Sequence, residues 1–145
     1  MGAQPIDVDL VSGEGDFAEA ASVLSQLRPQ YSESGLRSQI NKQREAGYQV
    51  ACARTAGRII GVAGFVVCEK LAWGKHIYVD DLVVDETHRS SGAGSALISW
   101  LKAYGRELGC QELHLDSGVQ RFAAHRFYLR HGFDITSHHF AACRL

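Results

Sequence analysis

A glycine-containing segment between an expected strand and an expected helix has the composition of a phosphate-binding loop. The strand ends at Val84, and the helix begins near Gly94. The first N–H groups of a helix have no acceptor within the helix, and the helix dipole places partial positive charge there. Glycine lets the backbone approach closely, so several N–H groups can converge on a phosphate. We therefore expect a pyrophosphate to bind at Arg89, Ser90, Ser91, Gly92, Ala93, Gly94 and Ser95.

Two common phosphate-binding motifs do not account for this loop. The P-loop needs Lys followed by Ser or Thr after its last glycine, and no such pair occurs here. The dinucleotide fingerprint needs a third glycine where the chain has Leu97, although Glu112 lies at about the distance of a ribose-binding acid. A doubly wound fold places the loop after its first strand, with several βα units to follow, and only about 50 residues follow here. The chain order disfavours a dinucleotide fold, and a glycine turn without a ligand is the simplest alternative.

Two adjacent carboxylates, Asp80 and Asp81, precede the loop on the same expected strand. Neighbouring residues of a strand face opposite sides of the sheet unless a β-bulge re-aims them. A carboxylate can attract a cationic amine and accept its proton, directly or through water. Asp80 has the same parity as Leu82 and Val84, and Asp81 has the opposite parity. A solvated aspartate at a strand edge is the alternative.

The other chemically versatile side chains form no recognisable metal site. The four cysteines are far apart and include no CxxC pair, which indicates reduced thiols in a cytoplasmic protein. His138 and His139 precede Cys143, but their spacing is not that of a structural zinc site, so we expect no metal. Arg126 and Arg130 are four residues apart and share a helix face, which either contacts phosphates or is solvated.

Length and charge limit the function classes. A chain of 145 residues is expected to form one domain over residues 1–145. The formal net charge of −1 gives no overall field that would draw the protein to nucleic acid or to a membrane. The longest apolar stretch, residues 59–68, is far shorter than the ~20 residues of a membrane-spanning helix.

Hydrophobic periodicity predicts ten elements around these residues. Strands are expected over 6–11, 48–55, 58–69, 75–84, 112–116 and 133–145. Helices are expected from 17 to 27, from 34 to 45, from about 92 to 109, and from 123 to 131. Antiparallel strands come first, and a parallel βαβ unit follows the glycine loop. The sequence therefore predicts a mixed α+β fold with a mostly antiparallel, twisted sheet of about six strands and about four helices.

Two motifs in this order resemble the GNAT superfamily of N-acetyltransferases. Arg89-x-x-Gly92-x-Gly94 is similar to the acetyl-CoA loop of that superfamily, and the stretch from His125 to Phe133 resembles its "FYxxxGF" helix. The stretch from Gly118 to Phe140 is most similar to the aminoalkylphosphonate acetyltransferase branch. The resemblance covers nearly the whole chain and implies a GNAT-type fold.

The resemblance also implies roles for individual residues. The backbone of the segment Leu82, Val83 and Val84 would pair with the pantetheine arm of acetyl-CoA, with a β-bulge near Asp81. Tyr128 would donate a proton to the leaving CoA thiolate, and Arg126 would lie near CoA. Asp80, which has the parity of Leu82 and Val84, would be the base, and Asp81 would contact the substrate. Tyr78 stands where some relatives carry a glutamate base. His138 or His139 would line the acceptor pocket.

The expected activity is transfer of an acetyl group from acetyl-CoA to a primary amine. The acceptor would be a small molecule such as an aminoalkylphosphonate or a polyamine-like amine. A protein lysine or N-terminus is the alternative acceptor, and a non-catalytic acyl-CoA-binding module is the alternative class. An exposed final strand would also let two copies pair as a homodimer.

Overall fold

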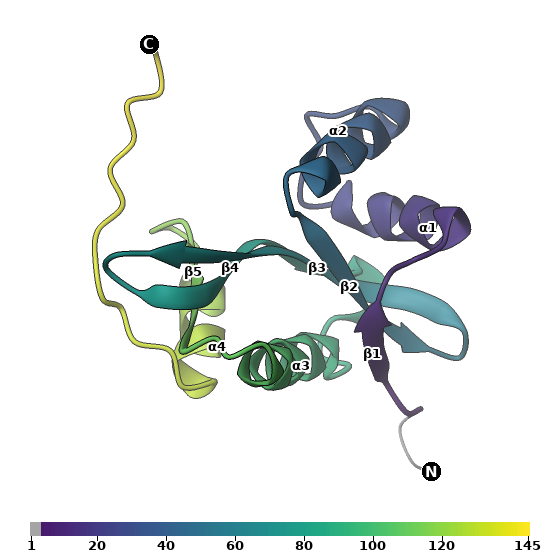
Figure 1. The fold of residues 1–145 in the computed structure, drawn as a ribbon. Helices are drawn as coiled ribbons and strands as arrows, with labels where there is room; N and C mark the ends of the chain where they lie inside the picture. Colours follow the sequence, from purple (N-terminus) through teal and green to yellow (C-terminus); the bar gives the residue numbers. More distant parts are fainter. Residues whose placement is uncertain (1–3) are drawn as a thin grey trace. The chain divides into compact units, whose positions relative to one another are not determined.

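Five strands form one sheet in the order β1-β2-β3-β4-β5 in the computed structural model, which describes residues 4–145 (Figure 1). The strands are β1 (Asp7–Leu10), β2 (Gln49–Thr55), β3 (Arg58–Lys70), β4 (Gly74–Val84) and β5 (Glu112–Leu115). The helices are α1 (Glu14–Leu24), α2 (Glu33–Glu45), α3 (Ala93–Glu107) and α4 (Phe122–Arg130), with the short 3-10 helix η1 (Glu86–His88) before α3. The predicted mixed α+β fold is confirmed.

The first four strands pair antiparallel with their neighbours, and β5 runs parallel to β4 after the α3 crossover. Alternating sequences rich in β-branched residues account for these strands. A short turn with positive φ at Ala56 and Gly57 joins β2 to β3. β2 and β3 therefore form a β-hairpin, over the ranges in which two strands were expected.

Helices cover both faces of the sheet, with α1 and α2 on one face and α3 on the other (Figure 1). The apolar face of α1, with Phe17 and Leu24, packs with Leu36 and Ile40 of α2 over buried residues of β2 and β3. On the other face, Phe65 of β3 lies edge-on to Trp100 and Tyr104 of α3. The middle of the sheet is thus buried from both sides.

The predicted final strand over residues 133–145 is absent. This segment has no regular secondary structure, and Ile135 and Phe140 are 76% and 91% exposed. A strand needs a neighbour for its N–H and C=O groups, and the sheet order contains no sixth strand. The hydrophobic pattern alone could not reveal that a partner was missing.

The chain forms two compact units, one up to His114 and one from Leu115 to Leu145. The first unit holds the sheet, α1, α2 and α3, whereas the second contains α4. The arrangement of the two units relative to each other is not determined, so a single domain over 1–145 stays a prediction.

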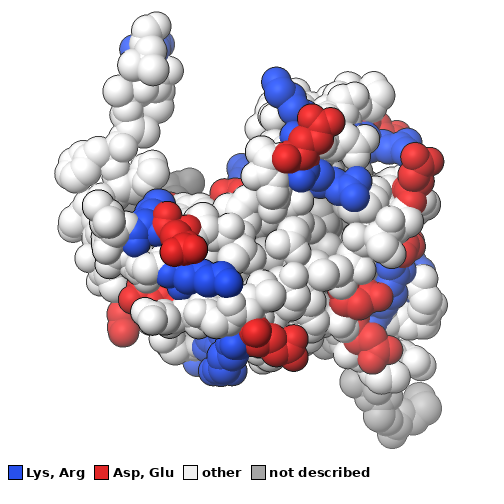
Figure 2. Space-filling model, in the orientation of Figure 1, with Lys and Arg blue, Asp and Glu red and all other residues white. Residues whose placement is uncertain are grey.

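Basic and acidic side chains are mixed over the face shown in Figure 2, and neither sign covers a continuous area of that face. No helix between residues 4 and 145 is long and apolar enough to cross a membrane.

Candidate active site

A β-bulge in β4 brings the two aspartates to one pocket. Gly64 of β3 is opposite Asp81 and Phe65 is opposite Val79, so Asp80 is the extra residue without a partner. The bulge lies one residue before the expected position. It re-aims the chain, because adjacent strand residues would otherwise point to opposite faces. Asp80 and Asp81 therefore both line the pocket beside β4.

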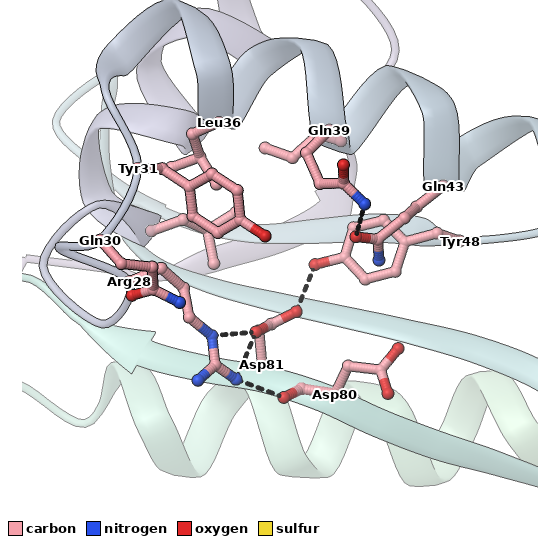
Figure 3. A pocket seen from close by; sticks show the side chains of 11 residues that line it. Arg28, Gln30, Tyr31, Leu36, Gln39, Gln43, Tyr48, Asp80 and Asp81 are labelled. Atoms are coloured by element: carbon pink, nitrogen blue, oxygen red, sulfur yellow. Dashed lines mark hydrogen bonds and ion pairs between the residues drawn. The ribbon is translucent and has the colours of Figure 1, made fainter. Parts of the chain in front are cut away.

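The pocket has a volume of about 280 Å³ and lies between β4, α2 and the segment that joins α1 to α2 (Figure 3). This volume is slightly below the ~300–1,000 Å³ typical of small-molecule sites. Polar side chains dominate its lining, which consists of Leu24, Arg28, Gln30, Tyr31, Leu36, Gln39, Ile40, Gln43, Tyr48, Asp80 and Asp81.

Both carboxylate oxygens of Asp81 are engaged by protein groups (Figure 3). Arg28 Nε donates to Oδ1 at 2.9 Å, and Arg28 Nη2 lies 2.8 Å from the same oxygen. The Tyr48 hydroxyl donates to Oδ2 at 2.7 Å. Burial, and then the negative charge of Asp81, raises the pKa of Tyr48 well above its usual value, so the phenol stays a donor.

Gly64 makes the bond between Tyr48 and Asp81 possible. A Cβ atom on Gly64 would overlap the Tyr48 hydroxyl, so only glycine leaves room for the ring above β3. Tyr48 is 5% exposed, and its hydrogen bond to Asp81 holds the hydroxyl beside the bulge. The requirement for glycine at this position is one of space and not of backbone conformation.

The carboxylate of Asp80, unlike that of Asp81, does not contact Arg28. Its backbone oxygen accepts a hydrogen bond from Arg28 Nη2 at 3.1 Å, while its side chain points away from Arg28 (Figure 3). Desolvation, and then the charge of Asp81, raises the pKa of Asp80 above its usual range, and the charge of Arg28 opposes this. A carboxylate with a raised pKa is a better proton acceptor, which suits the base role expected for Asp80.

The segment after β4 has the geometry expected of an anion-binding helix start. Ser90 and Gly92 have φ values of 67° and 93°, and α3 begins at Ala93 without an acidic residue in its first turn. Ala93 N donates to Ser91 Oγ at 3.3 Å. The positive end of the α3 dipole therefore meets no carboxylate in its first turn, and exposed Arg89 adds a positive charge beside it. These residues fit a pyrophosphate.

Gly61 of β3 sets how closely α3 approaches the sheet. A Cβ atom there would lie 3.2 Å from Leu97 Cδ1 and 3.4 Å from Ala93 Cβ. The first turn of α3 thus packs directly on β3 at Gly61, and Gly61 pairs with Val84 at the end of β4. This contact positions the loop at the carboxyl end of β4.

Gln26, just after α1, holds the beginning of the same loop. Its Nε2 donates to Asp85 Oδ1 at 2.8 Å, and its Oε1 accepts from Glu86 N at 3.0 Å. Thr87 Oγ1 and His88 Nδ1 contact the other oxygen of Asp85 at 2.7 and 3.0 Å. These hydrogen bonds, with that from Gln26 the largest contribution, hold the pKa of Asp85 below its usual range.

The segment Leu82 to Val84 pairs with β3 on one edge. On the other side, Gln111 N donates to Lys75 O at 2.8 Å, where β5 starts alongside β4. Because β5 has only four residues, it runs beside the first half of β4 and is too short to reach Leu82. The edge on which the pantetheine arm is expected is therefore not paired with β5.

The remaining predicted site residues lie in the second unit. Tyr128 of α4 is half-buried between Phe127 and Phe133. Burial raises the pKa of Tyr128, and the charge of Arg121 opposes this. Arg126 is exposed on the same helix. Their placement beside acetyl-CoA stays a prediction.

The second unit also contains the two C-terminal histidines and a buried serine. His138 and His139 are exposed in the irregular segment, and their place at the acceptor pocket stays a prediction. Ser117, which the sequence did not single out, has a buried hydroxyl without a hydrogen-bond partner among residues 4–145. No group of three or more metal-ligating side chains occurs in that same range.

Comparisons with known proteins identify the family of this chain. The sequence model of the acetyltransferase (GNAT) family matches residues 18–133. The glucosamine 6-phosphate N-acetyltransferase of Trypanosoma brucei brucei is 32% identical over 135 residues, which are 88% of this chain and 90% of that protein. An aminoalkylphosphonate N-acetyltransferase of Salmonella typhimurium is 36% identical, but over only 55 residues, 38% of this chain and 36% of that protein.

An aminoglycoside N-acetyltransferase solved with CoA has the same fold, with a TM-score of 0.84 and 17% identity over 99% of this chain and 98% of that chain. The similarity to the aminoalkylphosphonate enzyme covers only part of each chain and does not assign this protein to that branch of the family. The family match covers most of the chain, including β4, the glycine loop and α4. The chain thus belongs to the acetyltransferase (GNAT) family, as its two motifs indicated.

Proposed function

We propose that this enzyme transfers the acetyl group of acetyl-CoA to the nitrogen of a small primary amine held in the pocket beside Asp80. The observation that carries the proposal is the build of β4. Its bulge lies where Asp80 and Asp81 line the pocket, and the eight residues 85–92 connect its end to the start of α3. One strand thereby links an acidic pocket to an anion-binding helix start.

The donor would be held along β4 and at the loop that follows. The loop from Arg89 to Ser95 and the first turn of α3 would hold the pyrophosphate through N–H groups, hydroxyls and the positive charge of Arg89. The pantetheine arm would pair with the backbone from Leu82 to Val84, on the edge that β5 does not reach. The thioester would then lie near the bulge at Asp80.

The chemistry requires the amine to lose a proton before it attacks. Asp80 would attract the ammonium group and accept its proton, directly or through water. The amine nitrogen then forms a bond to the thioester carbon, and the bond from that carbon to sulfur breaks. Tyr128 is proposed to protonate the departing thiolate. The products are the N-acetylated amine and free CoA, and one proton is released overall.

The size of the pocket favours a small acceptor over a protein. A volume of about 280 Å³ suits a small molecule, whereas a peptide needs an extended groove. The relative from Trypanosoma brucei brucei is named for an amino-sugar phosphate, which supports an amine of this size. Protein acetylation is therefore the weaker candidate.

Thermal-shift measurements with acetyl-CoA, CoA, NAD and ATP test the donor. Acetyl-CoA and CoA are expected to raise the melting temperature, because a ligand at a hundred times its Kd adds ~2.7 kcal/mol of stability. A response to NAD alone would overturn the assignment. Mass spectrometry of the reaction with an amine then tests acetylation itself, and a gain of one acetyl group on the amine is expected.

A second copy of the chain is proposed as the partner of the C-terminal segment. Residues 133–145 expose Ile135, Phe140 and Leu145 and lack regular secondary structure. Exposed apolar side chains on a segment outside the sheet suit pairing with a strand of another copy. Light scattering is expected to give about twice 15.9 kDa for the full chain. A chain that ends at Asp134 is expected to be monomeric, and a monomeric full chain would contradict the proposal.

A further inference from the structure

The pocket beside Asp80, in which the acceptor is proposed to bind, is lined by more acidic than basic side chains. Its lining contains one cation, Arg28, and two carboxylates, Asp80 and Asp81. The guanidinium of Arg28 is directed at Oδ1 of Asp81 through both Nε and Nη2 (Figure 3). Its charge is therefore balanced by Asp81, and the charge of Asp80 remains.

An anionic group on the acceptor would find no cation of its own in this lining. Proteins bind phosphate and phosphonate with Arg or Lys side chains or with clusters of backbone N–H groups. Arg28 already has a carboxylate partner, and Nη2 also donates to the backbone oxygen of Asp80. A phosphate that approached Arg28 would have to compete with Asp81 and would meet the charge of Asp80.

Neutral polar groups supply the rest of the polar lining. Gln39 Nε2 donates to Gln43 Oε1 at 3.0 Å, which leaves the Gln39 oxygen and the Gln43 amide nitrogen for a ligand (Figure 3). Gln30 and Tyr31 add a further amide and a hydroxyl at the pocket wall. Amides and phenols both donate and accept, so they match hydroxyl and amine groups without selecting for negative charge.

We propose that the acceptor is a cationic primary amine whose other polar groups are hydroxyls or amines, and that Asp81 excludes phosphate- and phosphonate-bearing amines by serving as the counter-ion of Arg28. This inference rests on the proposed acetyl transfer and specifies its substrate class. It makes Asp81 a specificity-determining residue, distinct from the base Asp80. The acceptor therefore differs from an aminoalkylphosphonate in charge.

Matched pairs of acceptors test the proposal. Glucosamine is compared with glucosamine 6-phosphate, and ethanolamine with 2-aminoethylphosphonate, by the release of the CoA thiol. The wild-type kcat/KM is expected to be at least about tenfold higher for the member without phosphorus in a pair that is turned over. A preference for the phosphorylated member would overturn the proposal.

Substitution of the counter-ion provides the second arm. Asp81→Asn keeps the size of the side chain and removes its charge, so Arg28 becomes available to an anion. The ratio of the two kcat/KM values is expected to move at least about tenfold toward the phosphorylated acceptor. The double variant Asp81→Asn with Arg28→Gln is expected to lose this gain, and an unchanged ratio in Asp81→Asn would contradict the role of Asp81.

Tyr48→Phe is the matched control. It removes the other hydrogen bond to Asp81 without changing any charge, so the ratio between paired acceptors is expected to stay as in the wild type. A thermal shift with acetyl-CoA shows whether each variant is folded. If the proposed acetyl transfer itself is wrong, no amine with or without a phosphorus group would release CoA. That result differs from a wrong substrate class, in which the phosphorylated amine would be preferred. The wild-type comparison alone decides the substrate class if a variant does not fold.

Discussion

Gln26 contacts two consecutive residues of the loop that precedes α3, because its amide donates to Asp85 Oδ1 and accepts from Glu86 N. The two hydrogen bonds join positions about 60 residues apart in the sequence. They connect the end of the helix that covers the acceptor side of the sheet to the segment that leads to the expected pyrophosphate site. The donor loop and the pocket wall are therefore held by the same part of the chain.

Gln26→Ala is expected to weaken acetyl-CoA binding several-fold and to lower stability by about 1–2 kcal/mol, because two hydrogen bonds are lost. Isothermal titration with acetyl-CoA and thermal melting measure both effects. Gln4→Ala, at an exposed position, is the control and should change neither quantity. Wild-type affinity in Gln26→Ala would contradict a positioning role.

The ion pair of Asp85 with His88 and its hydrogen bonds predict a pH dependence of stability. The folded-state pKa of Asp85 is depressed, so its contribution is present above the unfolded value of about 3.9 and is lost as pH falls through the folded value. The difference in unfolding free energy between the wild type and Asp85→Asn should therefore shrink as the pH is lowered from neutral. A difference independent of pH would contradict this linkage.

Gly92→Ala is expected to reduce acetyl-CoA affinity and to cost about 1 kcal/mol of stability, since φ is 93° at this position. Gly57→Ala is a matched control, because Gly57 also has a positive φ, 77°, in the turn between β2 and β3. It should show a similar loss of stability with unchanged acetyl-CoA affinity. Equal losses of affinity in both variants would show that strain alone explains the effect.

If Asp80 is the base, its ionisation sets the acid limb of the profile of kcat/KM against pH. A raised pKa means that kcat/KM for the amine should rise with pH through a value above the usual ~3.9. In Asp81→Asn this limb should move to lower pH, because the charge of Asp81 contributes to the upward shift of the Asp80 pKa. Initial rates measured across pH decide this, and an unmoved limb would count against Asp80 as the titrating group.

Tyr128→Phe is expected to lower kcat by about 10²-fold or more while leaving the KM for acetyl-CoA within a few-fold. The phenol is protonated below its pKa, and burial raises that pKa, so the wild-type rate should not fall through loss of this proton until above pH ~10. Tyr104→Phe removes a hydroxyl that bonds Gln49 and serves as the control. An unchanged kcat in Tyr128→Phe would rule out the acid role.

The parts of the fold that depend on local sequence were predictable. The spacing of apolar residues gave the four helices to within a few residues, and glycines placed their ends, as at Gly109 and Gly132 with positive φ. The prediction of a final strand over residues 133–145 was wrong, because strand pairing depends on a neighbouring strand that a single segment cannot specify. The bulge was expected from the resemblance to the family and not from the residues of β4 themselves.

The contacts that shape the pocket could not be predicted from the sequence. Arg28 and Asp81 are separated by 53 residues, and Tyr48 and Asp81 by 33, so neither periodicity nor a local motif links them. Gly64 was equally hidden, since its requirement for glycine arises from the ring of Tyr48 and not from a turn. The parity argument for Asp80 did not survive the bulge, which brings both aspartates to the pocket.

The most direct test of acetyl transfer at this site is the rate of CoA thiol release from acetyl-CoA, measured with and without glucosamine or ethanolamine, in the wild type and in Asp80→Asn. Release by the wild type is expected to depend on the amine, and Asp80→Asn is expected to lower kcat/KM for the amine by about 10²–10⁴-fold while acetyl-CoA still binds. Amine-independent release, or a wild-type rate in Asp80→Asn, would contradict the proposed function.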